Sequence, residues 1–520
     1  MTGRLESRYP DAVDVAVVGS GPAGAAWART LHENAPHLRV AVFEVGPVLS
    51  DPAGDHVKNI ADPQARRRAQ RASEGPAADP DGDQPPASAD GRRGRPGTFL
   101  LGDGFAAGGT GLPVGAMSSN VGGMGAHWTC ACPRPGGTER IDFVEDLDEL
   151  LDEAERLLGV DARALAGAPL AGQVRELLGT ALDADRPADR RVQPMPLAVR
   201  REVDGTGAAR AHWSGPSVVL GDVLEHGVGL HPETLVERVL RDEHGAVRGI
   251  AVRDRRDGST AEVAAGVVVV AADALRTPQL LFASGVRPPA LGRYLNDQPQ
   301  VLLAVRLPDE VLAGDAVDEH AGTAIDGSSG VSWVPFDDDR HPFHGQVMQM
   351  DASPVPRPDL PADRPGAYVG LGWFCAKDVR AQDRVEFDES ATDDYGMPAP
   401  RVHYELTDVD AQRLAAAKTA IAAAARALGR PIDDAPIELP AGSSLHYQGT
   451  TRMGRTDDGT SVCDVNGEVW GVPGLFVAGN GLIPTETACN PTLTTVALAV
   501  GGARHVAKNL ATRTEGGDGS

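Results

Sequence analysis

The chain has 520 residues, with 49 lysines and arginines against 73 aspartates and glutamates, and a formal net charge of −24. Such a charge repels phosphate backbones and anionic lipid headgroups, so we expect no nucleic acid and no membrane as partner. The chain is too long for one ordinary compact core, and we expect two lobes with room for a large cofactor between them.

Cellular compartment and thiol state also follow from composition. No run approaches the ~20 consecutive apolar residues of a membrane span, and residues 1–12 lack the apolar core of a signal peptide, so the expected compartment is the cytoplasm. Five cysteines are too few for a disulfide framework in so long a chain, and Cys130 and Cys132 are closer together than zinc-ribbon ligands. We expect reduced, structural thiols and no metal site.

The first predicted elements are a strand at residues 13–18, a glycine turn of sequence GSGPAG at 19–24, a helix at 25–35 and a strand at 39–44. In a dinucleotide fingerprint the first glycine permits the turn, the second lets main-chain amides approach a pyrophosphate, and the third lets the helix pack on the strand. The pyrophosphate then faces a helix N-terminus. Glu44 ends the second strand, where it can accept hydrogen bonds from a ribose diol. The unit predicts a dinucleotide site without deciding between NAD and FAD.

The next segment, residues 51–97, is rich in Asp, Pro, Gly, Ala and Arg and has almost no large apolar side chains. Burial cannot offset the ordering entropy of such a segment, so we expect a long surface loop or partial disorder. The arginines at residues 66–68 and 92–93 alternate with acids in an acidic protein. They are interpreted as solvated charge.

Strand signals return further along the chain. Residues 234–240 and 247–253 flank a turn and predict a hairpin that caps the nucleotide-binding lobe. Residues 266–272 predict a buried strand, which leads into a helix begun by proline at residues 277–281. These elements add a second strand–helix step to the same lobe.

The following region, residues 301–439, has a more β-like pattern. Together with residues 131–214 we assign it to a substrate lobe built on an antiparallel sheet, with an alanine-rich helix at residues 410–428. The candidate strands cover residues 331–336, 346–350, 368–374 and 401–406.

The C-terminal region predicts a short strand at residues 474–481 and an amphipathic helix that reaches about residue 506. Asn490 stands at the cap position and Pro491 at the first helical position, so this helix end exposes amides and carries roughly half a positive charge. Such an end suits an anionic reduced flavin.

Six motifs occur in order along the chain: the fingerprint at 19–24, VGGMGAHWTC at 121–130, LGRYLND at 291–297, DDYGMP at 393–398, LHYQGTTRMG at 445–454 and NPTLT at 490–494. In this order they resemble the glucose–methanol–choline (GMC) oxidoreductases, and within them the pyranose oxidases and bacterial glycoside 3-oxidases. The resemblance implies FAD as the cofactor. It also implies an α/β fold with a Rossmann-like FAD-binding domain and a discontinuous antiparallel-sheet substrate domain, as in p-hydroxybenzoate hydroxylase.

We divide the chain on this basis. The FAD-binding domain is expected to comprise residues 1–130, 215–300 and 440–520, and the substrate domain residues 131–214 and 301–439.

The resemblance implies that His446 and Asn490 form the catalytic pair. A neutral imidazole with an ordinary pKa of about 6.5 can accept the proton of a substrate hydroxyl while hydride leaves the same carbon. Asn490 would orient the hydroxyl and stabilise its developing negative charge. The alternative for His446 is a buried, hydrogen-bonded histidine without a chemical role.

In fungal pyranose oxidases the histidine that matches His127 is bonded covalently to the flavin, and Thr129 matches a threonine that lies against the isoalloxazine edge. Gly125 and Ala126 stand where those enzymes carry Ser and Thr, so we expect FAD to be bound without a covalent bond. The expected cofactor-binding residues are Gly19, Gly21, Pro22, Ala23, Gly24, Glu44, Gly123, Met124, His127, Trp128, Thr129, Val236, Ala272, Asn480, Pro491 and Thr492.

For substrate contacts, residues 346–351 resemble a strand whose Gln and Asp bind sugar hydroxyls in the family. The spacing leaves open whether Gln346 or Gln349 is the match, and we select Gln349, with Asp351 and Gln448, as the candidates. The alternative is an edge strand with polar residues that point outward.

The expected reaction is oxidation of a C3 or C2 hydroxyl of a sugar or glycoside, C-glycosides included, with hydride transfer to flavin N5. Oxygen then accepts the electrons, which gives a keto product and hydrogen peroxide. The alternatives are a pyranose 2-oxidase or a quinone-dependent dehydrogenase of free sugars. An NAD(P)H-dependent monooxygenase would need a second nucleotide fingerprint, which residues 108–111 do not provide because they follow no strand. A flavin-binding scaffold without activity is a further alternative, and no oligomerisation arm is evident.

Overall fold

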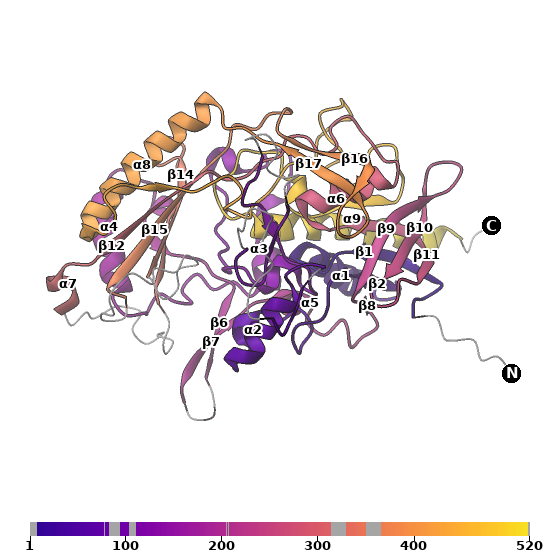
Figure 1. The fold of residues 1–520 in the computed structure, drawn as a ribbon, viewed down its shortest axis with the longest axis horizontal. Helices are drawn as coiled ribbons and strands as arrows, with labels where there is room; N and C mark the ends of the chain where they lie inside the picture. Colours follow the sequence, from indigo (N-terminus) through magenta and orange to yellow (C-terminus); the bar gives the residue numbers. More distant parts are fainter. Residues whose placement is uncertain are drawn as a thin grey trace.

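Two sheets organise the molecule, and they lie at opposite ends of its long axis (Figure 1). Helices and irregular segments fill the space between the two sheets. The computed structural model describes residues 8–76, 78–82, 94–102, 111–203, 205, 207–313, 329–349 and 366–517.

The first sheet has the strand order β8-β2-β1-β11-β10-β9, with β20 paired to β11. Its central strand β1 pairs in parallel with β2 and β11, and Val15 and Val17 of β1 are fully buried, as a strand covered on both faces requires. The predicted opening strands and the later hairpin are confirmed, while the strand expected from residue 266 begins six residues earlier, at Thr260. The bounds are β1 (Ala12–Val18), β2 (Val40–Phe43), β8 (Gly229–His231), β9 (Thr234–Arg241), β10 (Val247–Asp254), β11 (Thr260–Val270) and β20 (Leu475–Val477).

Helices α1 (Pro22–Asn34), α3 (Leu147–Leu158) and α9 (Thr492–Gly517) pack together on one face of this sheet. Trp27 of α1 lies in their interface against Phe476 of β20, with the ring centroids 5.7 Å apart. α1 begins inside the glycine turn rather than after it, because proline suits the first position of a helix. α9 extends beyond its predicted end.

Helix α6 (Asp273–Ala283) corrects the prediction of a helix begun by proline, because Pro278 lies inside it. The Asp273 carboxylate caps the helix by accepting two main-chain amides of the first turn. Pro278 has no N–H to donate to the carbonyl of Ala274, and the Thr450 hydroxyl donates to that carbonyl instead. A contact from a distant segment therefore makes the internal proline tolerable.

The second sheet is antiparallel and has the strand order β18-β12-β15-β14-β13-β5, with β19 paired to β12. Helices α8 (Asp408–Leu428) and α4 (Ala171–Leu182) cover one of its faces, where Leu414 and Ile421 enter the core (Figure 1). The predicted antiparallel substrate sheet is confirmed. The bounds are β5 (Gln193–Pro194), β12 (Gln300–Arg306), β13 (Val331–Val334), β14 (Phe343–Gln349), β15 (Tyr368–Cys375), β18 (Arg430–Pro431) and β19 (Ile437–Glu438).

The strand predicted at residues 401–406 does not join the second sheet. β17 (Pro398–His403) pairs with β16 (Arg384–Thr392) in a separate hairpin that packs against α6. Pro398 and Pro400 lack the N–H that a central strand donates to its neighbour, which explains why this strand stays in a two-stranded hairpin.

The segment predicted as a surface loop is largely ordered where the structure describes it. Helix α2 (Pro63–Ala72) begins after Asp62, whose carboxylate accepts two main-chain amides of the first turn. Ser73 and Glu74 then lie buried and bond to the main chain of Gly97 at 2.9 and 3.1 Å. A helix cap and buried polar contacts thus replace the apolar burial that the composition lacks.

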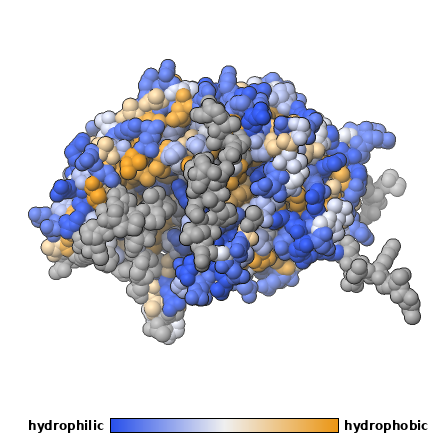
Figure 2. All heavy atoms as spheres, in the orientation of Figure 1, coloured by the Kyte–Doolittle hydropathy of each residue, from blue (hydrophilic) through white to orange (hydrophobic). Residues whose placement is uncertain are grey.

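The arginines at 92–93 lie outside the described residues. The predicted domain boundaries stay a prediction. On the face shown in Figure 2 most of the described surface is hydrophilic. Among the described residues no helix is long and apolar enough to cross a membrane. The short elements are β3 (Phe99–Leu100), β4 (Ala116–Met117), β6 (Val199–Val203), β7 (Ala209–Trp213), α5 (Pro216–Leu220) and α7 (Asp309–Ala313).

Candidate active site

The glycine turn between β1 and α1 has two packed positions and one open position. A Cβ at Gly19 would lie 2.4 Å from the carbonyl oxygen of Ala271, and a Cβ at Gly24 would lie 2.0 Å from the carbonyl oxygen of Gly19. At Gly21 the nearest atom to a Cβ is the carbonyl oxygen of Gly122, 3.9 Å away. The turn therefore leaves space beside Gly21 and the N-terminus of α1, which fits the pyrophosphate of a dinucleotide.

Glu44, at the end of β2, is buried and tied to this turn. One carboxylate oxygen accepts the Ser20 amide at 3.0 Å and the Ser20 hydroxyl at 2.7 Å, and the other accepts the Gly46 amide at 3.0 Å. Burial raises the pKa of Glu44. These bonds hold the carboxylate at the end of β2, beside the glycine turn.

The segment after Gly122 faces the same space. Helix η4 (Gly123–Ala126) begins where Gly122 and Gly123 take positive φ angles of 98° and 50°, and it contains Met124. A Cβ at Gly123 would lie 3.6 Å from the Cα atom of Gly21. The two predicted glycine motifs are therefore brought face to face.

His127 follows this helix, and burial lowers its pKa to about 4. Its Nε2 lies 3.3 Å from Oδ1 of Asn120, while its buried Nδ1 faces Gly97 and has no hydrogen-bond partner among the described residues. A pKa of about 4 leaves the His127 ring neutral at neutral pH. The next residue, Trp128, donates from its indole N–H to the carbonyl of Ser214 at 2.8 Å.

The remaining predicted cofactor contacts come from several elements. Val236 of β9 lies in the core of the first sheet, and the Ala272 amide donates to the hydroxyl of Thr277 at 3.1 Å. Asn480 begins helix η9 (Asn480–Leu482), and its Oδ1 accepts the hydroxyl of Thr495 at 2.5 Å. Pro491 and Thr492 stand at the start of α9, with Ala23 and Pro22 in the first turn of α1.

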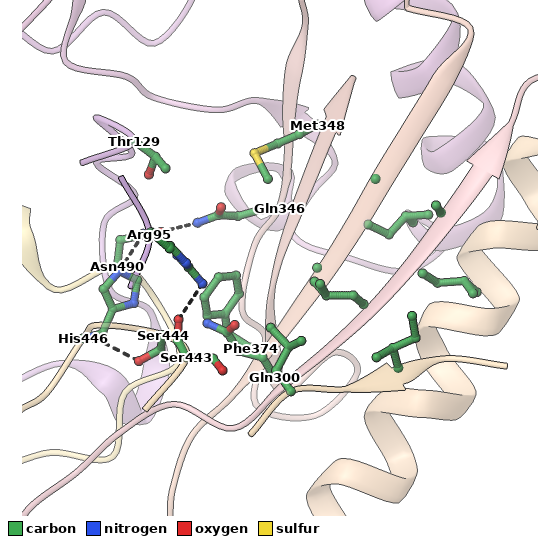
Figure 3. Close-up of a pocket in the computed structure, with 18 of the residues that line it drawn as sticks. Arg95, Thr129, Gln300, Gln346, Met348, Phe374, Ser443, Ser444, His446 and Asn490 are labelled. Atoms are coloured by element: carbon green, nitrogen blue, oxygen red, sulfur yellow. Dashed lines mark hydrogen bonds between the residues drawn. The ribbon is translucent and has the colours of Figure 1, made fainter. Parts of the chain in front are cut away.

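A cavity of about 140 Å³ lies between the second sheet and the C-terminal segments (Figure 3). Residues of β12, β14 and β15 form one wall, among them Leu302, Gln346 and Phe374. The other wall carries the two predicted catalytic residues. The polar and aromatic side chains around the cavity include Arg95, Thr129, Gln300, Gln346, Phe374, His446 and Asn490.

The structure brings His446 and Asn490 together at this cavity (Figure 3). Nδ2 of Asn490 lies 3.3 Å from Nε2 of His446. A single hydroxyl oxygen can therefore reach both atoms, which is what a base and a hydrogen-bond donor acting on one hydroxyl require.

A turn rich in buried hydrogen bonds presents His446. The His446 amide donates to Oγ of Ser444 at 2.9 Å, and the Ser444 hydroxyl donates to Asp297. Asp297 also accepts the Gly442 amide at 2.7 Å, and burial raises its pKa to about 6. Leu445 has a φ of 60°, a conformation that a side chain rarely adopts, so this turn is held by its contacts.

The loop before Asn490 is held by a buried carboxylate. One oxygen of Glu139 accepts the amides of Ala488 and Cys489, both at 2.8 Å, and the other accepts the Gly136 amide at 3.0 Å. Glu139 is 1% exposed, and burial raises its pKa. Since a carboxylate with three main-chain donors fixes the loop, Asn490 has a defined position.

The charges around His446 favour its neutral form. Burial, with the positive charge of Arg95 as a second cause, lowers the pKa of His446 to about 3. The Arg95 guanidinium donates to the carbonyl of Ser443 at 3.0 Å. His446 is therefore unprotonated at neutral pH and able to accept a proton.

Gln346, not Gln349, lies at the cavity. Nε2 of Gln346 donates to Oδ1 of Asn490 at 2.5 Å and lies 3.2 Å from Nε2 of His344. The indole N–H of Trp333 donates to Nδ1 of His344 at 3.0 Å, so this ring has a fixed orientation. Strand periodicity explains the choice between the glutamines, because an odd spacing places them on opposite faces of β14.

The other predicted substrate residues are placed elsewhere. Gln349 donates to the carbonyl of Pro169 at 2.6 Å and accepts the Gly330 amide, away from the cavity. Gln448 is fully buried and accepts the hydroxyl of Thr487 at 2.6 Å. Asp351 lies outside the described residues.

Four residues at the site were not singled out from the sequence. Gln298 contacts His446, and the other three line the cavity. Gln298 directly follows the motif at residues 291–297, and this position is the signal that could have found it. The others are Arg95, Gln300 and Phe374.

This fold and site define the class: an oxidoreductase that binds a dinucleotide and acts on a CH–OH group. The GMC oxidoreductase family matches in two parts, over residues 145–300 and 380–499. The chain is 57% identical over 510 residues to the C-glycoside 3-oxidase of Arthrobacter globiformis, covering 97% of this chain and 96% of the relative. It is 33% identical over 434 residues to the pyranose 2-oxidase of Tricholoma matsutake, covering 77% and 75%.

The chain belongs to the GMC oxidoreductase family. Membership implies that it binds a flavin. In fold, it is similar to a formate oxidase of Aspergillus oryzae whose structure addresses FAD modification, with a TM-score of 0.66 and 15% identity over 96% of this chain and 99% of that chain. The Rossmann-like and antiparallel-sheet architecture predicted from the sequence is thereby confirmed.

Proposed function

We propose that the protein is an FAD-dependent glycoside 3-oxidase, which converts the C3 hydroxyl of a pyranose ring, in C-glycosides among others, to a ketone. The observation that carries the proposal is the 57% identity to a C-glycoside 3-oxidase over nearly the full length of both chains. The contact between His446 and Asn490 beside the cavity supports it, because the chemistry needs a base and a donor at one hydroxyl.

The proposed chemistry follows from the two side chains. His446 accepts the hydroxyl proton at Nε2, and Asn490 donates from Nδ2 to the same oxygen as its negative charge develops. FAD, when bound, supplies the acceptor for the hydride. Because both side chains act on the same hydroxyl, the carbon that carries this hydroxyl is the carbon that is oxidised.

The cavity walls support a sugar ring as the substrate. Gln300 and Gln346 place amide groups on one wall, where each can donate to one hydroxyl and accept from another. The ring of Phe374 is stacked on His446, with centroids 5.8 Å apart and planes at 23°. An aromatic ring beside amide groups suits a pyranose, which has C–H faces and a hydroxyl rim.

We assign the FAD contacts to the glycine turn, Glu44 and the segment around His127, with no covalent bond. Two observations support non-covalent FAD: Nε2 of His127 lies beside Asn120, and main chain at Gly97 occupies the side of Nδ1. Acid precipitation of the purified protein is expected to leave the yellow colour in the supernatant. Colour in the pellet of the wild type but not of His127→Ala would show a covalent bond instead.

The C3 position is favoured over C2 by the comparisons, since identity to the pyranose 2-oxidase is 33% against 57% for the 3-oxidase. Oxygen is the proposed electron acceptor, with hydrogen peroxide as the product, and a quinone is the alternative. No observation favours an NAD(P)H-dependent monooxygenase.

The decisive experiment is anaerobic mixing of the purified yellow protein with a panel of free monosaccharides, O-glycosides and C-glycosides. We expect glycosides to bleach the flavin band and NMR of the product to show a C3 ketone. His446→Ala, with flavin content matched, is the control for reduction at this site. A C2 ketone from free sugars, or no bleaching by any member of the panel, would contradict the proposal.

A further inference from the structure

We propose that Gln298 is a positioning residue that determines which nitrogen of His446 accepts the substrate proton. Gln298 lies just before β12, is 1% exposed and does not line the cavity. Its Oε1 lies 2.7 Å from Nδ1 of His446, on the side of the ring opposite the catalytic Nε2. Gln298 therefore acts through His446 and not on the substrate.

The orientation of the Gln298 amide is fixed by two main-chain carbonyls. Its Nε2 donates to the carbonyl of Thr487 at 3.1 Å and to that of Cys489 at 2.7 Å. A carbonyl oxygen can only accept, so the amide nitrogen must face these two groups. The amide oxygen is then the atom that faces His446.

The orientation of the amide determines the tautomer of the ring. An amide oxygen can only accept, so Nδ1 of His446 must carry the proton, and a neutral imidazole carries one N–H. Nε2 therefore has the lone pair, and it faces the Asn490 amide group at 3.3 Å. The opposite tautomer would put an N–H where the substrate proton has to arrive.

Gln298 also connects the two catalytic residues. The carbonyls that hold its amide belong to the loop that leads into Asn490, and its oxygen holds His446. One side chain thus fixes the ring and the loop that face the same hydroxyl.

A neutral partner has a further consequence for the proton transfer. As the O–H bond of the substrate breaks and an N–H bond forms at Nε2, His446 becomes a cation whose Nδ1–H still donates to Gln298. The amide takes no proton. A carboxylate in this place would stabilise the imidazolium and raise the pKa of His446, so that more of the base would already carry a proton from solvent before substrate arrives, whereas the amide leaves His446 neutral.

This inference rests on the proposed role of His446 as the base, and the first test does not depend on turnover. Holoenzyme labelled with ¹⁵N-histidine is examined by NMR without substrate, and His446→Asn identifies the His446 signals. We expect a protonated Nδ1 and an unprotonated Nε2 in the wild type, and a mixture or reversal in Gln298→Leu. A protonated Nε2 in the wild type would overturn the proposal, even if no glycoside reduced the enzyme.

The second test follows flavin reduction by a glycoside across pH. In Gln298→Leu the limiting rate is expected to fall about 10²-fold, the lower end of what a positioned base contributes, with little change in glycoside affinity. In Gln298→Glu the acid limb of the rate is expected to move to higher pH, with much of the rate regained above it. Flavin content and Tm serve as controls for folding, and the NMR result decides alone if the Glu variant does not fold. An unchanged rate in the Leu variant, or a wild-type pH profile in the Glu variant, would overturn the proposal.

Discussion

The glycine turn at residues 19–24 and the catalytic cavity are built in different ways. The turn is one continuous segment, and the atoms that crowd a Cβ at Gly19 or Gly24 most closely are main-chain oxygens. The cavity joins residues of β12, β14, β15 and the C-terminal segments with Arg95 and Thr129 from the N-terminal part of the chain. A change in the turn should therefore act on folding or cofactor binding, and a change in the cavity on chemistry or substrate affinity.

The largest expected effect is at the cavity. His446→Ala removes the base at the contact with Asn490, so the rate of flavin reduction by a glycoside should fall by about 10²–10⁴-fold. Flavin content should be unchanged, because His446 is not among the residues that we assign to the cofactor. Stopped-flow absorbance measures both, and loss of flavin from this variant would break the comparison.

In the turn, two glycines should give opposite results. Gly24→Ala places a Cβ 2.0 Å from a main-chain oxygen, so the protein should lose at least about 3 kcal/mol of stability or not fold. Gly21→Ala has open space, so the apoprotein should fold with a nearly unchanged Tm but bind FAD more weakly. Thermal unfolding and FAD titration check the pair, and equal behaviour of the two variants would contradict it.

Two glutamines of β14 sharpen the comparison within one strand. Gln346→Leu removes a cavity amide that bonds to Asn490, so kcat/KM should fall, together with some stability because Oδ1 of Asn490 loses this partner. Gln349→Leu leaves the amide of Gly330 and the carbonyl of Pro169 without their partner, so stability should fall by about 1–3 kcal/mol with KM unchanged. Steady-state kinetics and denaturant unfolding of both variants decide, and a raised KM in Gln349→Leu would contradict the assignment.

The smallest expected effect is a shift with pH. Arg95 is a cationic neighbour that lowers the pKa of His446, so Arg95→Gln should raise that pKa from about 3 towards its ordinary value. The base is active when neutral, so the acid limb of kcat/KM should move to higher pH, with little change above neutrality. Arg95→Lys keeps the charge and serves as the control. An acid limb that stayed in place in Arg95→Gln would show that burial alone sets the pKa.

The sequence was sufficient where structure depends on local pattern. The glycine turn, the apolar run of β1 and the β-like pattern of residues 301–439 predicted both sheets, since strand and turn signals are read from neighbouring residues. The motifs around His446 and Asn490 predicted a pair that the structure places in contact.

The sequence was insufficient where hydrogen bonds between distant segments determine the structure. Helix α6 tolerates Pro278 because Thr450 bonds the carbonyl that proline leaves free, and no local pattern contains that contact. Arg95 belongs to the segment predicted as a surface loop, yet contacts of Ser73 and Glu74 with Gly97 hold that segment beside the cavity that Arg95 lines. Whether Gln346 or Gln349 points into the cavity depends on which face of β14 each side chain occupies. The register of β14 with its neighbours decides this.

The central claim is that His446 and Asn490 act on the hydroxyl at C3 of a glycoside. Anaerobic flavin reduction by one glycoside, prepared with deuterium at C3 or at C2, tests this most directly. We predict that deuterium at C3 slows bleaching of the flavin band several-fold and that deuterium at C2 has no effect. Slowing by deuterium at C2 alone would contradict the account.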